Sequence, residues 1–221
     1  MAQRLRTTFD RAFADVQRDL LALGEAVDGG IARSLESLSR RDIDLAAQVI
    51  RDDEAINDLR FRIEEACLAL IATQQPAATD LRLVIAAMSI VVDMERMGDH
   101  ATGIAKTVLR MGDEPFVKPL QDIPRMADLS REMLRESLQA FLRRDAVRAR
   151  AIAARDDEVD HLYKAVFDEL VAIMAHDPSA VAGSTYLLWC AHNLERIGDR
   201  VTNIAERVVF VTTGDMRELN D

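Results

Sequence analysis

The sequence predicts an all-α protein made of two tandem antiparallel three-helix bundles, six long helices in total, related by an internal repeat. Hydrophobic residues make up 49% of the 221 positions and charged residues 30%, with only 9 Gly and 5 Pro. This composition is typical of long amphipathic helices. No segment carries the alternating pattern of a strand. Several segments also recur about one hundred residues further along the chain, which indicates a repeat.

The repeat is visible in short stretches of similar sequence. The stretch "SLESLSRRD" (34–42) matches "SLQAFLRRD" (137–145) at an offset of 103 residues, and "DEAINDL" (53–59) matches "DDEVDHL" (156–162) at the same offset. From residue 94 onward the offset is 100. We therefore expect two copies of one unit, at residues 1–112 and 119–215, joined by "MGDEPFVKP" (111–119).

Three helices are expected in each unit, separated by recognisable stop signals. Asp42 and Asp145 follow paired arginines and should cap the second helix of each unit. Pro76 and Pro178 mark the break before the third helix. The predicted helices cover residues 4–40, 43–74, 78–111, 122–143, 146–175 and 180–212.

The third helix of the first unit shows the clearest packing pattern. Its apolar residues at 90, 94, 97, 101, 104 and 108 alternate steps of four and three, as in the seam of an antiparallel bundle. The first helix is the weakest assignment because Gly29 and Gly30 fall inside it, and glycine costs about 1 kcal/mol relative to alanine in a helix.

The third helix of each unit carries one copy of a similar acidic motif, "DMERMGDH" (93–100) in the first unit and "NLERIGDR" (193–200) in the second. In a helical hairpin, residues equidistant from the turn lie side by side, so each motif should face an acidic pair on the preceding helix. The residues brought together in this way are Asp53, Asn57, Glu95 and Asp99 in the first unit, and Asp156, Asp160, Glu195 and Asp199 in the second.

Clustered carboxylates repel one another unless a positive charge neutralises them, since even one like-charge pair four residues apart costs about 0.2–0.5 kcal/mol. Arg96, Arg196 and Arg200 are one source of positive charge. A metal cation is the other, and oxygen ligands favour Mg, Mn or Fe over a structural zinc site. Gly98 and Gly198, which have no side chain beside each aspartate, would admit either a metal or a closely packed helix.

At these residues the sequence resembles the PhoU family of phosphate-signalling proteins. The resemblance covers nearly the whole chain and rests on "ERMGDHATGIAK" (95–106), on "NLERIGDRVTNIAE" (193–206), and on Pro76 followed by "DLR" at 80–82. It implies two tandem three-helix bundles. It also implies metal sites on pairs that match Glu95/Asp99, Glu195/Asp199 and Asp156/Asp160.

The resemblance further implies a cytoplasmic, non-catalytic regulator of phosphate uptake and of phosphate-starvation signalling. Members of this family act as negative regulators between the ATPase subunit of a phosphate ABC transporter and a phosphate-sensing histidine kinase. Some carry iron or zinc clusters and others manganese or magnesium, so divalent or ferric ions are the expected cofactors. A homodimer is compatible with the pattern, and contact with the membrane is expected only through partners.

One departure from the family leaves the first metal site open. The family commonly has aspartate where this chain has Asn57, so the ligands could instead come from Glu54 and Asp58, which also have the four-residue spacing. Sequence alone does not decide between these two registers of the helix.

Two other function classes compete with the regulatory one. A metal-free helical adaptor would have the same bundles. A di-iron carboxylate enzyme would need its Glu-x-x-His motif on two helices, but this chain has His192 and Glu195 in the reverse order, with Val92 at the repeat position of His192. No nucleophile paired with a base is recognisable.

The net charge and the cysteine content limit the possible partners and the cellular compartment of the protein. The net charge of −10 disfavours nucleic acid as a partner, because a phosphate-backbone binder needs a basic surface. Cys67 and Cys190 lie in apolar helical runs and form no C-x-x-C motif, as expected for buried thiols in a reducing compartment. We expect neither a secretion signal nor a membrane span.

Overall fold

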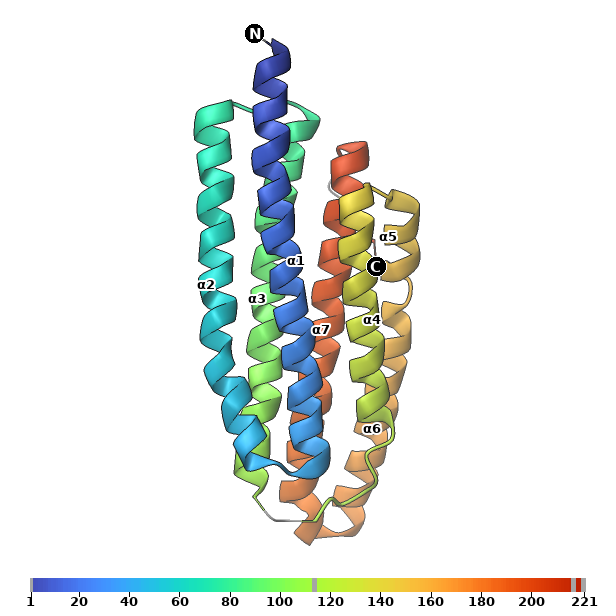
Figure 1. Ribbon diagram of the computed structural model, residues 1–221. Helices are drawn as coiled ribbons and strands as arrows, with labels where there is room; N and C mark the ends of the chain where they lie inside the picture. The colour runs from blue at the N-terminus through green and yellow to red at the C-terminus, as the bar shows by residue number, and fades with distance from the viewer. Residues whose placement is uncertain (1, 113–114, 216–217, 220–221) are drawn as a thin grey trace.

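Two antiparallel three-helix bundles lie side by side along a common long axis (Figure 1). The computed structural model describes residues 2–112, 115–215 and 218–219, and all regular structure among these residues is helical. The first bundle consists of α1 (Ala2–Arg40), α2 (Ile43–Gln74) and α3 (Thr79–Met111). The second consists of α4 (Asp122–Arg143), α5 (Ala146–Ala153), α6 (Asp156–His176) and α7 (Val181–Thr213), with the short 3₁₀ helix η1 (Pro178–Ala180) before α7. The predicted fold class is confirmed.

The helix starts follow the capping pattern of the sequence. Asp42 accepts a hydrogen bond from the backbone N–H of Leu45 at 2.9 Å, and Asp145 accepts one from Arg148 at 2.9 Å. Each carboxylate therefore satisfies a backbone donor that the first helical turn leaves without a partner. Both predicted caps are confirmed, and both arise from the repeated "RRD" sequence.

The predicted helix 146–175 is wrong in one respect, because it is interrupted between α5 and α6. The N–H of Arg155 donates to the carbonyl of Ile152 at 2.9 Å, which closes a tighter turn than an α-helix. Neither glycine nor proline marks the break. The reason lies in the residues after it: Asp156, Asp157 and Glu158 form the first turn of α6, where a helix N-terminus favours negative charge. The equivalent helix of the first unit, α2, is continuous.

Helices α3 and α7 form the centre of the molecule, where they pack against each other and join the two bundles. Helices α1 and α4 make a second contact between the bundles. The predicted seam of α3 is confirmed, since its six apolar residues are all almost completely buried: Ile90, Met94, Met97, Ala101, Ile104 and Val108. Helix α1 continues through Gly29 and Gly30 because Leu23, Val27 and Ile31 on its inner face are fully buried.

The connection between the bundles starts at Gly112, whose φ of +58° ends α3 in a conformation that glycine adopts easily. Asp113 and Glu114 of the predicted linker lie outside the described residues. Further along, the guanidinium of Arg41 lies 4.3 Å from the centre of the Phe116 ring, which fixes the linker against the end of α1. Across the described part of the chain, no helix is both long enough and apolar enough to cross a bilayer.

Candidate functional site

The first acidic cluster lies between α2 and α3. The Asp53 carboxylate sits over Gly98, with Oδ1 3.4 Å from the position that a Cβ atom at Gly98 would occupy. Burial raises the pKa of Asp53, and the negative charge of Asp99 raises it further. The amide of Asn57 donates to the Asp53 carbonyl at 3.2 Å and lies 3.5 Å from its Oδ2. Asp53 therefore lies near enough to Asp99 for the two carboxylate charges to interact.

Glu95 is the most buried acid of this cluster, with 7% of its surface exposed. Its Oε1 accepts a hydrogen bond from Arg60 at 3.2 Å. Its Oε2 is buried without a hydrogen bond, 3.5 Å from Arg96 Nε. Arg96 also donates to Asp99 at 2.9 Å. Arginines from α2 and α3 thus neutralise Glu95 and Asp99, and Arg60 takes the place beside Glu95 that the hairpin geometry had assigned to Asn57.

The second acidic cluster lies between α6 and α7. Asp156, which is 5% exposed, accepts a hydrogen bond from the hydroxyl of Thr202 at 3.0 Å. Its Oδ1 lies only 2.7 Å from the position of a Cβ at Gly198. Each glycine of the repeated motif therefore seats an aspartate from the facing helix. This arrangement agrees with the close-packing interpretation of these glycines.

Like charges concentrate in this second cluster. Burial raises the pKa of Glu195, and the charges of Asp199, Asp160 and Asp156 raise it further. Much of Asp160 is exposed, yet partial desolvation of its carboxylate and the nearby charge of Asp199 raise its pKa as well. Arg196 compensates in part, because it donates to Asp199 at 2.7 Å. The charges of Asp156, Asp160 and Asp199 thus all act on the carboxylate of Glu195.

One positive charge expected beside the second cluster is directed elsewhere. Arg200 pairs with Asp93 of α3 at 3.4 Å and with none of the acids of the second cluster.

Within residues 2–112, 115–215 and 218–219, no three His, Cys, Asp or Glu side chains are close enough to form a ready metal-binding group. Glu54 and Asp58 are exposed on α2, whereas Asp53 and Asn57 are half-buried toward α3. The helix packing therefore favours the Asp53/Asn57 register.

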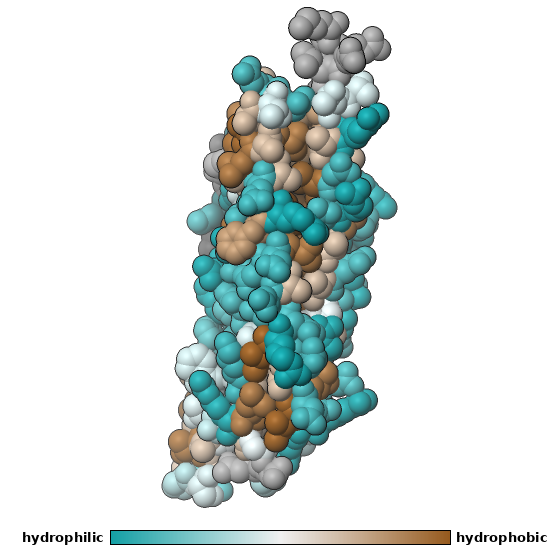
Figure 2. Space-filling view, turned by 60° about the vertical axis from the view of Figure 1, so that its left-hand side comes forward, coloured by the Kyte–Doolittle hydropathy of each residue, from teal (hydrophilic) through white to brown (hydrophobic). Residues whose placement is uncertain are grey.

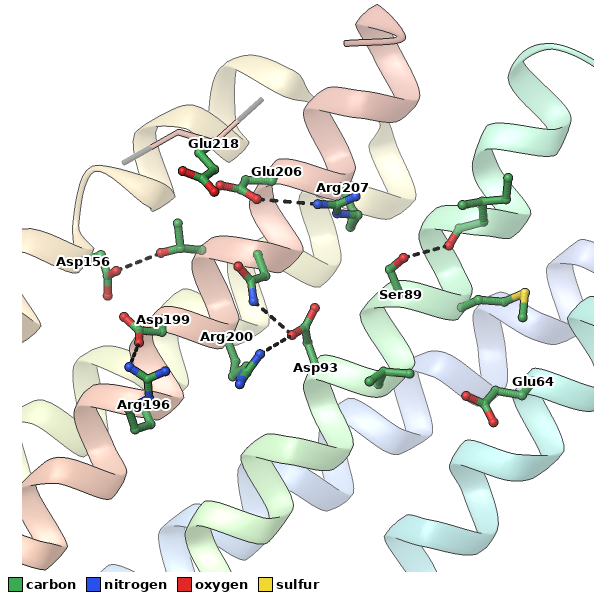
Figure 3. Close-up of a pocket in the computed structure, with 15 residues that line it drawn as sticks. Glu64, Ser89, Asp93, Asp156, Arg196, Asp199, Arg200, Glu206, Arg207 and Glu218 are labelled. Atoms are coloured by element: carbon green, nitrogen blue, oxygen red, sulfur yellow. Dashed lines mark hydrogen bonds and ion pairs between the residues drawn. The ribbon is translucent and has the colours of Figure 1, made fainter. Parts of the chain in front are cut away.

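Sequence reasoning missed a pair of polar contacts between the two units. On one side Asp93 of α3 lies 3.4 Å from Arg200 and accepts a hydrogen bond from Asn203 at 3.1 Å, both on α7 (Figure 3). On the other side Asn193 of α7 lies 3.0 Å from Nδ1 of His100 on α3. Asn193 is the repeat counterpart of Asp93, and His100 that of Arg200, at the offset of 100. The offset itself was the signal that could have revealed this contact.

A groove of about 1080 Å³ opens between α3 and α7 beside the Asp93 and Arg200 pair. Glu64 of α2 borders it on one side and Asp156 of α6 on the other. Figure 3 shows Asp93 and Arg200 pointing toward each other across the groove, with Arg196 and Asp199 next to them along α7. The groove thus reaches the second acidic cluster.

The two cysteines take no part in these sites. Both are free and buried, as predicted. Burial raises the pKa of each thiol to about 12, so both stay protonated and unreactive near neutral pH.

Comparison with known protein families accounts for the repeated motifs. A sequence model described as "PhoU domain" matches the chain twice, over residues 20–108 and 123–208. The chain belongs to the PhoU family. Each PhoU domain match contains one Glu-Arg-x-Gly-Asp motif. The resemblance stated from the sequence is confirmed.

Relatives of the PhoU family match over nearly their whole length. The chain is 37% identical over 217 residues to the "Phosphate-specific transport system accessory protein PhoU homolog" of Clostridium acetobutylicum, covering 98% of this chain and 99% of the relative. It is 36% identical to the homologue of the same description from Streptococcus pneumoniae, covering 98% and 100%.

Solved PhoU structures have the same architecture. The crystal structure of the phosphate transport system regulatory protein PhoU from Streptococcus pneumoniae superposes with a TM-score of 0.89 at 34% identity, covering 95% of this chain and 99% of that one. PhoU from Pseudomonas aeruginosa also gives 0.89, at 36% identity, covering 94% and 100%. The six-helix plan is therefore shared at full length.

Proposed function

We propose that this protein is a cytoplasmic accessory regulator of phosphate uptake, which holds the phosphate-starvation response off when phosphate is plentiful. In this role it contacts the ATPase subunit of a phosphate ABC transporter and passes the state of the transporter to a membrane histidine kinase. The observation that carries the proposal is the match, over nearly the full length of both chains, to proteins described as accessory to phosphate-specific transport. A catalytic step is not part of the proposal.

We further propose that the two acidic clusters bind metal cations. The chemistry of the donors supports this, because carboxylate oxygens gather between two helices in each bundle. Glu95 Oε2 and Glu195 Oε2 are buried without hydrogen bonds, and the pKa of Glu195 is raised by burial and by its acidic neighbours. A cation such as Fe, Zn, Mn or Mg would supply positive charge to these oxygens. Arg96 pairs with Asp99, and Arg196 pairs with Asp199. Each arginine would have to release its aspartate before that carboxylate could bind a metal.

The regulatory proposal is tested by deleting the gene in its host and measuring a phosphate-starvation reporter in phosphate-rich medium. We expect the reporter to become active in the deletion strain and to be repressed again when the wild-type gene is restored. A reporter that stays repressed after deletion would refute the proposed function.

A second measurement separates the regulator with metal from the metal-free adaptor. Protein purified without chelator is analysed for bound metals, with the Asp199→Ala variant and a matched variant of an exposed acid outside the clusters, Asp168→Ala, as control. We expect Asp199→Ala alone to lower the metal content. Equal metal content in all three proteins would reject Asp199 as a ligand, and metal-free wild-type protein would favour the adaptor.

A further inference from the structure

The start of the second helical segment carries a different charge in the two repeat units. Residues 143–155, "RRDAVRARAIAAR", contain five arginines and one acid, whereas the repeat counterpart at 40–52, "RRDIDLAAQVIRD", contains three arginines and three acids. Val147 stands where the first unit has Asp44, and two arginines of the second unit stand where the first has apolar residues. Both segments begin a helix of the same repeated fold, so this fold does not itself require the arginines.

The paired arginines before this helix also differ in their partners. In the first unit Arg40 pairs with Glu36 at 2.7 Å. In the second unit Gln139 stands at the repeat position of Glu36, so Arg143 has no acid one turn before it. The second unit therefore lacks the acid that neutralises this arginine in the first.

Three arginines of the segment keep their charge available. The side chains of Arg143, Arg144 and Arg150 are exposed, and within the described part of the chain none of them forms an ion pair or a side-chain hydrogen bond. The other two arginines of the segment are neutralised by glutamates of α4. Asp145, the only acid of the segment, caps α5. An excess of positive charge therefore remains here, on a protein whose net charge is −10.

Helix α5 places an apolar strip beside these arginines. Val147, Ala151 and Ala154 are exposed, and their spacing of four and three residues puts them on one side of the helix. Val147 is 82% exposed, and the opposite side of α5, which includes Ile152, is buried against α7. Figure 1 shows α5 at the outer edge of the second bundle. Together with the three unpaired arginines, this strip makes the basic face of α5.

From this arrangement we propose that the basic face of α5 binds the surface of an anionic phospholipid bilayer, with its arginines on the lipid phosphates and Val147 among the headgroups. Helices with an apolar strip flanked by basic side chains lie in the headgroup region in this way. Each basic residue near an anionic surface raises affinity about fivefold, so three arginines raise it about hundredfold. Direct contact with lipid goes beyond the proposed function, which involves contact with proteins only.

A bilayer fits the basic face of α5 better than an acidic protein does. Binding to a protein depends on a few large side chains that fill pockets. The exposed apolar residues of α5 are one valine and two alanines, and the groove between α3 and α7 contains no residue of α5. A bilayer requires no pocket, because small apolar side chains enter the headgroup layer and arginines contact lipid phosphates.

Larger exposed apolar side chains occur on α2, but without such charge. Phe61 and Leu68 are 54% and 56% exposed, and Figure 2, which brings the α2 side of the molecule forward, shows apolar side chains in separate patches between hydrophilic ones. The guanidinium of Arg60 lies 5.2 Å from the centre of the Phe61 ring, but it pairs with Glu64 and Glu95. The positive charge beside Phe61 is therefore neutralised, and we assign no membrane contact to α2.

The test compares two full-length variants that each lose three exposed arginines. The face variant combines Arg143→Gln, Arg144→Gln and Arg150→Gln. The control variant combines Arg11→Gln, Arg110→Gln and Arg125→Gln, which are exposed positions on α1, α3 and α4. Both variants change the net charge equally, and circular dichroism checks that both are folded.

Binding is measured by cosedimentation with vesicles of equimolar phosphatidylglycerol and phosphatidylcholine, and with vesicles of phosphatidylcholine alone. Wild type should bind the anionic vesicles only, with affinity falling as salt rises, because screening weakens the attraction between charges. The face variant should lose about hundredfold in affinity, and the control variant should stay close to wild type. No binding by wild type, equal binding to both kinds of vesicle, or equal losses in the two variants would overturn the proposal.

A gain in binding provides a second measurement that loss of folding cannot imitate. Val147→Trp should raise affinity for the anionic vesicles, because tryptophan favours the membrane interface. Its emission should shift to the blue on binding, while wild type, whose single tryptophan is Trp189 on α7, should show no shift. Unchanged affinity and emission in Val147→Trp would refute insertion of α5. If wild type binds soluble polyglutamate but not vesicles, and the face variant binds neither, the basic face of α5 belongs to an acidic protein and the bilayer proposal is wrong.

Discussion

Replacing Gly198 by alanine should destabilise the protein, although alanine is the better helix former. A Cβ at this position would lie 2.7 Å from Oδ1 of the buried Asp156 carboxylate, closer than nonbonded atoms approach. The aspartate must move, which weakens its hydrogen bond from Thr202. The helix propensity gain is about 1 kcal/mol. Overpacking costs about 1–3 kcal/mol, and a hydrogen bond to a charged group contributes about 1.5–3 kcal/mol. With the hydrogen bond fully lost, the net destabilisation would be about 1.5–5 kcal/mol, and with the bond only weakened we expect the lower part of this range.

Two other glycines serve as controls for this prediction. A Cβ at Gly30 would meet no other atom within 4 Å, so Gly30→Ala should stabilise the protein by about 1 kcal/mol. A Cβ at Gly98 would lie 3.1 Å from the flexible end of Ile56 and 3.4 Å from Asp53, and Gly98→Ala should fall between the two. The assay is urea unfolding followed by circular dichroism, with all proteins in chelator. If Gly198→Ala proves as stable as Gly30→Ala, the close seating of Asp156 over the glycine is wrong.

The remaining predictions concern charge in the acidic clusters. The second cluster offers four acids and the first only three with the neutral amide of Asn57, so metal titration should give two steps, since ligand charge controls affinity at oxygen sites. Asp160→Ala should abolish the tighter step and Asn57→Asp should strengthen the weaker one, and an unchanged weak step would reject Asn57 as a ligand. Because the folded-state pKa values of Asp53 and Glu195 are raised, the folded protein binds more protons than the unfolded chain. The contribution of these two acids to the stability of the metal-free protein should therefore be lost as pH rises above the ordinary values of 3.8 for Asp and 4.5 for Glu. Glu195→Gln should reduce that loss in urea unfolding measured across pH, and an equal slope in both proteins would contradict the assignment.

Much of the fold was predictable because its signals are local. The paired "RRD" caps, the two turn prolines and the α3 seam each depend on a few neighbouring residues, and all appear in the structure. The break before Asp156 was missed because no helix-breaking residue marks it. The acidic residues of the first turn were the only local signal, and the same composition also occurs inside the continuous helix α2.

The candidate site was predictable only up to the contacts within one hairpin. Turn positions bring Asp53 toward Asp99 and Asp160 toward Asp199, because equal distances from a turn fix the register. The partners of the arginines depend on packing between units instead. Arg200 directly follows Asp199 in the sequence, and this position does not reveal which acid it pairs with. Only the packing of α3 against α7 brings it to Asp93. The groove was equally unpredictable, because its lining comes from several helices that only the packing of the two units brings together.

The unequal contacts between α3 and α7 also determine which halves of such a protein can recognise each other. Two first halves facing one another would set Asp93 against His100, and two second halves would set Asn193 against Arg200. Neither pairing reproduces the combination of Asp93 with Arg200 and Asn203. Because Asp93 lies on the first half and Arg200 on the second, the packing of one half against the other is favoured over the packing of two like halves.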